Sequence, residues 1–184
     1  MADSARSSAP LLVLTIGHST RSLAQFVELL KSHAVAHLVD VRTIPGSARH
    51  PQFNRDTLPY PLVSLGIAYT HMPGLGGLRR PRPDSINLAW RNPGFRGFAD
   101  YMQTQAFEVH LAALLALAAR ERTAIMCAEA VPGRCHRSLV ADALVAHGAT
   151  VEHILSAARG EPHRLSPHAR VTGQAVSYPQ QSER

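Results

Sequence analysis

Both cysteines of the chain lie in one stretch, "CAEAVPGRCHRS", at residues 127–138. Cys127 and Cys135 are eight positions apart. Four charged or titratable side chains accompany them: Glu129, Arg134, His136 and Arg137. A cysteine beside a proton acceptor and cations is typical of a thiol nucleophile, because positive charge stabilises the reactive thiolate. This stretch is therefore the first candidate for a chemical site.

Four interpretations of the two cysteines remain open. Cys127 or Cys135 could be a nucleophile, with Glu129 or His136 as its acid–base partner. The thiols could bind a metal with His136 or His18, but their spacing matches no standard zinc pattern, and we expect no metal. They could form a redox-active or regulatory pair, although a reducing compartment opposes a permanent disulfide. Finally, Cys127 could be a small buried apolar residue while Glu129 pairs with an arginine.

The stretch connects an expected strand over residues 123–129 to an expected helix over 137–148 that ends at Gly148. Residues 135–138 should therefore lie at the helix N-terminus. Backbone amides there bind anions and lower the pKa of a cysteine. Cys135 is accordingly the thiol that we expect the helix to activate, whereas Cys127 ends a strand.

Other apolar segments alternate in the same way between strand and helix patterns. We expect further strands over residues 11–17, 36–42, 67–72 and 150–155. Ser22 and Gln25 form a capping box that begins one helix, and a short helix near Pro59 ends at Gly66. Residues 94–104 and 106–121 predict one broken helix or two consecutive ones. The pattern predicts a single-domain, three-layer α/β fold with a mainly parallel sheet of about five strands and helices on both faces.

The ends of the chain and one long connection differ from this core. We expect residues 1–10 to be disordered or flexible, residues 11–156 to form the α/β domain, and residues 157–184 to form a tail with a small hairpin around "RVTGQAVSYP". The arginine- and proline-rich connection over 73–92 is typical of a lid or binding loop. No signal-peptide pattern or membrane-length apolar run is present, so we expect a cytoplasmic protein without a membrane partner.

Polar residues follow the predicted strands where parallel strands share one edge. Ligands bind beyond the carboxyl ends of such strands, so these residues should form one site. They are His18 and Ser19 after the first strand, Asp40 and Arg42 at the second, Tyr69 and His71 at the third, Cys127 and Glu129 at the fourth, and His153 in the fifth.

Charge favours an anionic ligand at this edge. The chain carries a formal charge of +6, and residues 42–96 hold eight arginines against two aspartates. Arginine suits phosphate and carboxylate, so a small anion or a nucleotide is the expected ligand, with nucleic acid as a further candidate. Neither "GHSTRS" nor "PGLGG" matches a dinucleotide or phosphate loop, so we expect no cofactor.

Five segments taken together resemble the domain of unknown function family 488: "TIGHST", "VDVRTIPGSARHPQFN", "YTHMPGLGG", "GFRGFADYM" and "CAEAVPGRCHRSLVAD". The resemblance covers roughly residues 13–155 and the tail. It implies a compact α/β domain with a C-x-E…C-H-R signature, and it supplies no substrate. It also implies these site positions: His18, Ser19, Arg42, Arg96, Tyr101, Cys127, Glu129, Cys135, His136 and Arg137.

The sequence therefore leads to two hypotheses of function. In the first, the protein is a thiol-dependent hydrolase or transferase that acts on a phosphorylated or nucleotide-like substrate, and Arg42, Arg96 and Arg137 hold the anion. In the second, the same pocket binds a nucleotide or nucleic-acid phosphate without catalysis.

Overall fold

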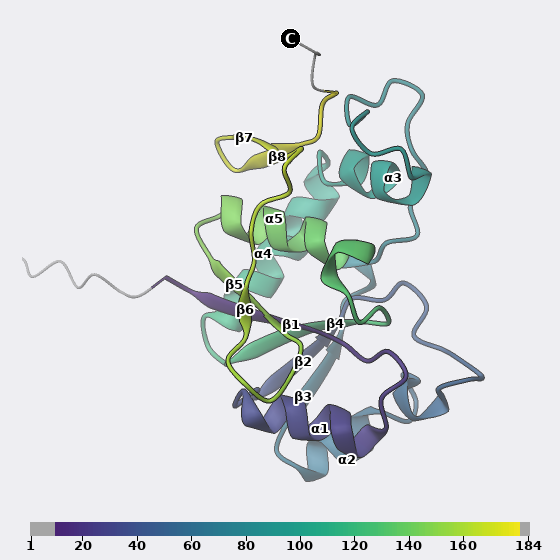
Figure 1. Cartoon of the computed structure of the whole chain (residues 1–184), viewed down its shortest axis with the longest axis vertical. Coiled ribbons are helices and arrows are strands. Elements are labelled where there is room, and N and C mark those ends of the chain that lie inside the picture. Colours follow the sequence, from purple (N-terminus) through teal and green to yellow (C-terminus); the bar gives the residue numbers. More distant parts are fainter. Residues whose placement is uncertain (1–9, 181–184) are drawn as a thin grey trace, which may run out of the picture.

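The central sheet has six strands, five of them parallel (Figure 1). The structure is a computed structural model that describes residues 10–180, so the flexibility expected of residues 1–9 lies outside the described residues. The spatial order is β3-β2-β4-β1-β5-β6. The strands are β1 (Leu12–Gly17), β2 (His37–Asp40), β3 (Ala68–His71), β4 (Thr123–Cys127), β5 (Thr150–Ile154) and the antiparallel β6 (Glu161–Pro162).

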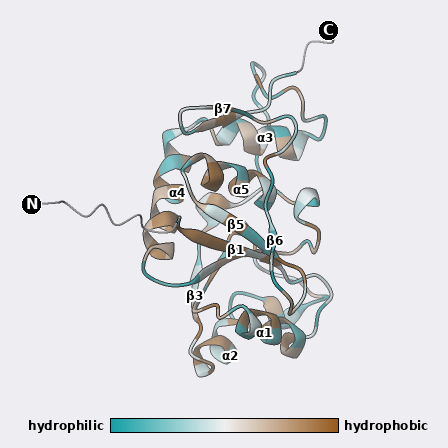
Figure 2. Cartoon of the chain, turned by 60° about the vertical axis from the view of Figure 1, so that its left-hand side comes forward, coloured by the Kyte–Doolittle hydropathy of each residue, from teal (hydrophilic) through white to brown (hydrophobic). Residues whose placement is uncertain are grey.

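Helices cover both faces of the sheet, which confirms the predicted three-layer α/β fold (Figure 1). One face carries α1 (Leu23–Ser32) and α2 (Pro59–Ser64). The other carries α3 (Pro93–Tyr101), α4 (Gln105–Ala118) and α5 (Arg137–Ala146). Each face has its own apolar core, and Figure 2 shows the apolar residues in the central strands and in the helices that cover them.

Local sequence signals explain where the helices begin and end. Ser22 and Gln25 form the predicted capping box at α1. Gly66 and Gly148 follow α2 and α5 with φ of 74° and 86°, a conformation that glycine adopts without strain. Thr104 separates α3 from α4, because its side chain accepts a hydrogen bond from the Phe107 amide and so caps a second helix.

The connection over residues 73–92 begins with a short 3-10 helix, η2 (Pro73–Leu75), and is then fixed by one buried carboxylate. Asp100 accepts hydrogen bonds from the Arg82 amide (2.8 Å), the Ser85 hydroxyl (2.6 Å) and the Asn87 side chain (2.8 Å). These contacts hold the connection against α3.

The tail is part of the packed domain. It contains β6 and an antiparallel hairpin formed by β7 (Arg170–Thr172) and β8 (Ala175–Ser177). Val176 and Tyr178 are buried in the core on the α5 side of the sheet. Within residues 10–180, no helix has the length and apolar character to cross a membrane.

Candidate functional site

The carboxyl ends of β1, β2 and β4 meet because β4 lies between the other two. The His18 amide donates to the Cys127 carbonyl (3.0 Å), and the Ser19 amide donates to the Ala128 carbonyl (2.8 Å). The Val41 amide donates to the Met126 carbonyl across the other side of β4. The strand ends that precede the signature loop are thus bound to each other.

A cavity of about 350 Å³ opens beside these strand ends. Its polar or titratable lining comes from Arg42, Thr43, Cys127, Glu129, Arg134, Cys135 and His136. Ile44, Leu78 and Phe95 contribute an apolar wall. Both cysteines therefore face the same space, together with the two proposed proton carriers.

The sulfur of Cys127 is held by Arg137, the residue that begins α5. The Arg137 guanidinium is fully buried, and its Nη1 donates to Cys127 Sγ at 3.3 Å while Nη2 donates to the Ala130 carbonyl. The pKa of Cys127 is lowered because the Cys135 thiol donates a hydrogen bond to it and because of the Arg137 charge; burial opposes this effect. Cys127 is thus the thiol that these neighbours favour as a thiolate.

Cys135 lies at the N-terminus of α5, as expected, but the direction of its pKa shift is the opposite of the expected one. Its pKa is raised by its hydrogen bond to Cys127 and by burial. The first amides of α5 are occupied locally: the Arg137 amide donates to Cys135 Sγ (3.4 Å), and the Ser138 and Leu139 amides donate to the carbonyls of Cys135 and His136. The Arg137 charge and amide act to lower the pKa of Cys135, but its hydrogen bond to Cys127 and its burial outweigh them.

The two proposed proton carriers differ in environment. His136 is largely buried, which lowers its pKa to about 4, and its Nδ1 lies 3.6 Å from Cys135 Sγ. It is therefore neutral at pH 7. Glu129 is exposed at the cavity and takes part in no salt bridge within the described chain.

Arg42 lines the cavity, but its donors are used within the protein. Its Nε and Nη2 bind the two oxygens of the fully buried Asp40, and Nη2 also binds the Phe53 carbonyl. His18 donates from Nδ1 to the Ser19 carbonyl, so its Nε2 accepts from Arg42 Nη1 at 3.2 Å. Burial lowers the pKa of His18 to about 4 and keeps it neutral. Hydrogen bonds within the protein thus fix the side chains of Arg42 and His18 beside the cavity.

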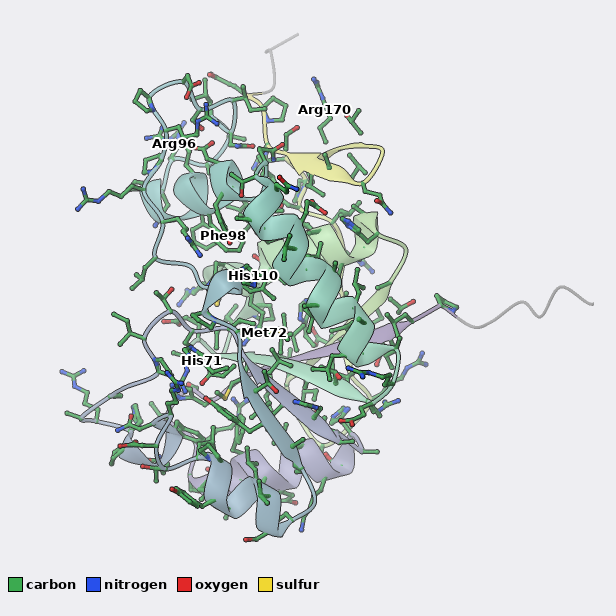
Figure 3. All side chains as sticks on the ribbon, turned by 180° about the vertical axis from the view of Figure 1, so that it is seen from behind. His71, Met72, Arg96, Phe98, His110 and Arg170 are labelled. Carbon is green, nitrogen blue, oxygen red and sulfur yellow. The ribbon has the colours of Figure 1, made fainter. Side chains whose placement is uncertain are left out.

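Five predicted positions lie outside the cavity lining: His18 and Arg137, which contact lining residues, and Ser19, Tyr101 and Arg96. Ser19 adopts a φ of 50° and is bound through its amide to the loop after β4. Tyr101 donates to the Gly74 carbonyl (2.8 Å), and its ring carries the Arg79 guanidinium at 3.7 Å. Arg96 lies on α3, and Figure 3 shows it away from His71 at the end of β3. It forms no salt bridge with Glu129 or Asp40.

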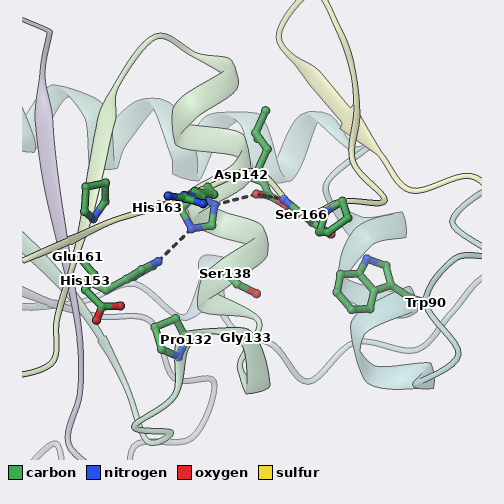
Figure 4. A pocket seen from close by; sticks show the side chains of 13 residues that line it. Trp90, Pro132, Gly133, Ser138, Asp142, His153, Glu161, His163 and Ser166 are labelled. Carbon is green, nitrogen blue, oxygen red and sulfur yellow. Dashed lines mark hydrogen bonds and ion pairs between the residues drawn. The ribbon is translucent and has the colours of Figure 1, made fainter.

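A second, larger cavity of about 720 Å³ lies on the other side of the signature loop (Figure 4). Pro132 and Gly133 of η3 (Pro132–Arg134) line it, whereas Arg134 lines the cysteine cavity. Its polar wall is a chain of hydrogen bonds from His153 to His163 (3.0 Å) and from His163 to Asp142 (2.7 Å). Sequence reasoning included His153 in the cysteine site, but its side chain lines this cavity instead.

Arg134 was not among the predicted site positions, although it is the exposed cation of the cysteine cavity. No salt bridge engages it in the part of the chain that the structure describes. Its position within the signature stretch was the sequence signal that could have identified it.

A comparison with family models finds one match over residues 22–144, described as "Domain of unknown function DUF488". This range begins after β1 and ends within α5, and it contains the whole cysteine stretch. Searches of curated proteins and of solved structures give no match.

Proposed function

The chain belongs to the DUF488 family of domains of unknown function, and we propose that it is a thiol-dependent enzyme, a hydrolase or transferase, with Cys127 as nucleophile and an anionic substrate. One observation carries the proposal: the sulfur of Cys127, which lines an accessible cavity, is in contact with the fully buried guanidinium of Arg137.

The buried cation supports an anionic sulfur. Arg137 forms no salt bridge with a carboxylate among residues 10–180. An uncompensated buried charge is costly, by several kcal/mol in order of magnitude. A Cys127 thiolate 3.3 Å away is the compensating charge that the fold provides. The same pairing lowers the pKa of the thiol and increases the fraction that can react at neutral pH.

The rest of the cavity suits a small anionic substrate. Arg134 is the unpaired cation that would bind a phosphate, because the donors of Arg42 are used by Asp40 and His18. The Cys127 thiolate would attack the electrophilic atom, and Glu129 would give a proton to the leaving group and then take one from the attacking water or acceptor. A cavity of about 350 Å³ lies within the range of small-ligand sites.

The test is a thiol titration followed by turnover assays. Cys127 should react with iodoacetamide at pH 6 to 7, with an apparent pKa below the usual value of about 8.5. The Cys127→Ser variant should lose this reaction and any hydrolysis of p-nitrophenyl phosphate or thymidine 5′-p-nitrophenyl phosphate. Reaction of both thiols only above about pH 8 would overturn the proposal.

A phosphate-binding module without catalysis is the second candidate. It is supported by the connection over 73–92, which gives Gly77 and Leu78 to the cavity wall and exposes Arg80 and Arg91. Phosphate or nucleotide binding that Cys127→Ser leaves unchanged, with no turnover of either chromogenic ester, would favour this function.

A further inference from the structure

Cys135 has no role in the proposed reaction, yet its sulfur shares a partner with that of Cys127. The Arg137 guanidinium binds Cys127 Sγ at 3.3 Å, and the backbone amide of the same residue binds Cys135 Sγ at 3.4 Å. Both thiols line one cavity. The hydrogen bond between the two thiols brings their sulfurs close to each other at a place that a small molecule can reach.

We propose that Cys127 and Cys135 form a peroxide-reactive dithiol, in which Cys127 is the attacking cysteine and Cys135 the resolving one. This inference rests on the reactive Cys127 thiolate of the proposed function. Its oxidant is a hydroperoxide, and its reductant is a small thiol.

The first step consumes one hydroperoxide. The Cys127 thiolate attacks the terminal oxygen of ROOH, the O–O bond breaks, and RO⁻ takes a proton from water to leave as ROH. Cys127 is then a sulfenic acid, oxidised by two electrons, while the peroxide is reduced.

The second step closes a disulfide. A Cys127 sulfenic acid no longer presents the thiolate that raises the pKa of Cys135, so Cys135 loses its proton to water and the resulting thiolate attacks the Cys127 sulfur. The S–O bond breaks, and the departing hydroxide takes up the released proton to form water. Two equivalents of a small thiol restore the dithiol and themselves become a disulfide.

The surrounding backbone can accommodate this closure. Residues Ala128, Glu129, Val131, Gly133 and Arg134, between the two cysteines, are all exposed. Hydrogen bonds from Ser19 and Arg137 hold Ala128 and Ala130, so the shift falls on Val131 and η3, where it disturbs little of the packed core. The disulfide would also remove the negative charge that faces the buried Arg137, which favours return to the dithiol once a reductant is present.

The test uses the full chain and one equivalent of hydrogen peroxide. Trypsin cuts after Arg122, Arg134 and Arg137, so the two cysteines fall in separate peptides, TAIMCAEAVPGR and CHR. In the wild type these peptides should be recovered linked, with the loss of two hydrogen atoms, and dimedone should label little protein. The Cys135→Ala variant should instead carry dimedone on Cys127. That experiment is run at about pH 8.5, because loss of the Cys135 hydrogen bond raises the pKa of Cys127.

The matched variant Cys127→Ala should show neither the link nor the label. A wild type that retains dimedone on Cys127, or that links only between two chains, overturns the dithiol. The proposed function survives that result if Cys127 still alkylates at pH 6 to 7. A Cys127 that reacts with neither peroxide nor iodoacetamide at that pH overturns both.

Discussion

Arg137 is the cation that contacts the Cys127 sulfur and helps to lower its pKa. Replacing it with methionine keeps much of its length and removes its charge. We expect Arg137→Met to raise the pKa of Cys127 and to slow alkylation at pH 6.5 roughly tenfold, since one pKa unit changes the thiolate fraction by that factor. The rate of alkylation against pH measures the shift.

The Arg134→Met variant distinguishes the effect of the charge beside the Cys127 sulfur from the effect of the charge at the edge of the cavity. Arg134→Met removes an exposed cation and should weaken substrate binding without moving the pH profile of alkylation. Arg137→Lys keeps a charge and should restore part of the shift. An Arg137→Met protein that folds, by circular dichroism, and keeps the wild-type profile would contradict this role.

The candidate site could be partly predicted from sequence because several of its members are neighbours in the chain. Cys127, Glu129, Cys135 and His136 fall within ten residues, and all four line one cavity. Which sulfur the Arg137 guanidinium contacts could not be predicted, because it depends on that side chain folding back toward the end of β4. A helix-terminus rule assigned the charge to Cys135 instead.

At the scale of elements, the end of β1 and the loop after β4 are packed too closely for a side chain at Gly17. A Cβ atom there would lie 1.8 Å from the Glu129 carbonyl oxygen. We expect Gly17→Ala to lower the free energy of unfolding by about 2 kcal/mol or more, because backbone must move to relieve the clash. The displaced loop should also change the rate at which Cys127 alkylates.

Gly133→Ala is the matched control, since no heavy atom lies within 4 Å of its added Cβ. It should unfold in urea within about 0.5 kcal/mol of the wild type. Equal stability of the two variants would show that the loop after β4 moves freely away from β1.

The elements found from sequence are those with strong local patterns. Alternation of apolar strands and amphipathic helices predicted the parallel sheet, and the capping box at Ser22 gave the start of α1. The two-residue β6 was missed because its pairing with β5 depends on tertiary contact. The sequence also could not predict that separate cavities lie on the two sides of the signature loop, because the wall of the larger cavity depends on where the tail packs.

Across the whole molecule, one chain of hydrogen bonds connects the sheet to the tail. Asp142 accepts from His163 Nε2 and from the Tyr178 hydroxyl, both at 2.7 Å. A carboxylate only accepts, so His163 Nε2 donates to it; His163 Nδ1 and His153 Nε2 form the next hydrogen bond of the chain, and His153 Nδ1 and the Thr15 hydroxyl form the last. This chain of hydrogen bonds ties β1 and β5 to α5 and the segment before Pro179, and burial keeps His153 neutral at pH 7.

This neutrality makes the fold sensitive to acid. Burial lowers the pKa values of His18, His136 and His153 to about 4, against a usual value of 6.5. Between these values the unfolded chain binds more protons than the folded one, so stability is complete above pH 6.5 and decreases as the pH falls toward 4. Each histidine should contribute on the order of 1 to 3 kcal/mol to this loss.

Urea unfolding at a series of pH values measures the slope. The wild type should lose stability steadily from pH 6.5 to 4.5, before most carboxylates are protonated. His153→Gln keeps a hydrogen-bonding side chain but does not titrate, so its stability at pH 7 should be lower and its slope shallower. His153 lines the larger cavity, whereas His18 and His136 belong to the cysteine site. If stability falls with pH equally steeply in the variant and the wild type, the acid sensitivity arises outside the network that holds the tail.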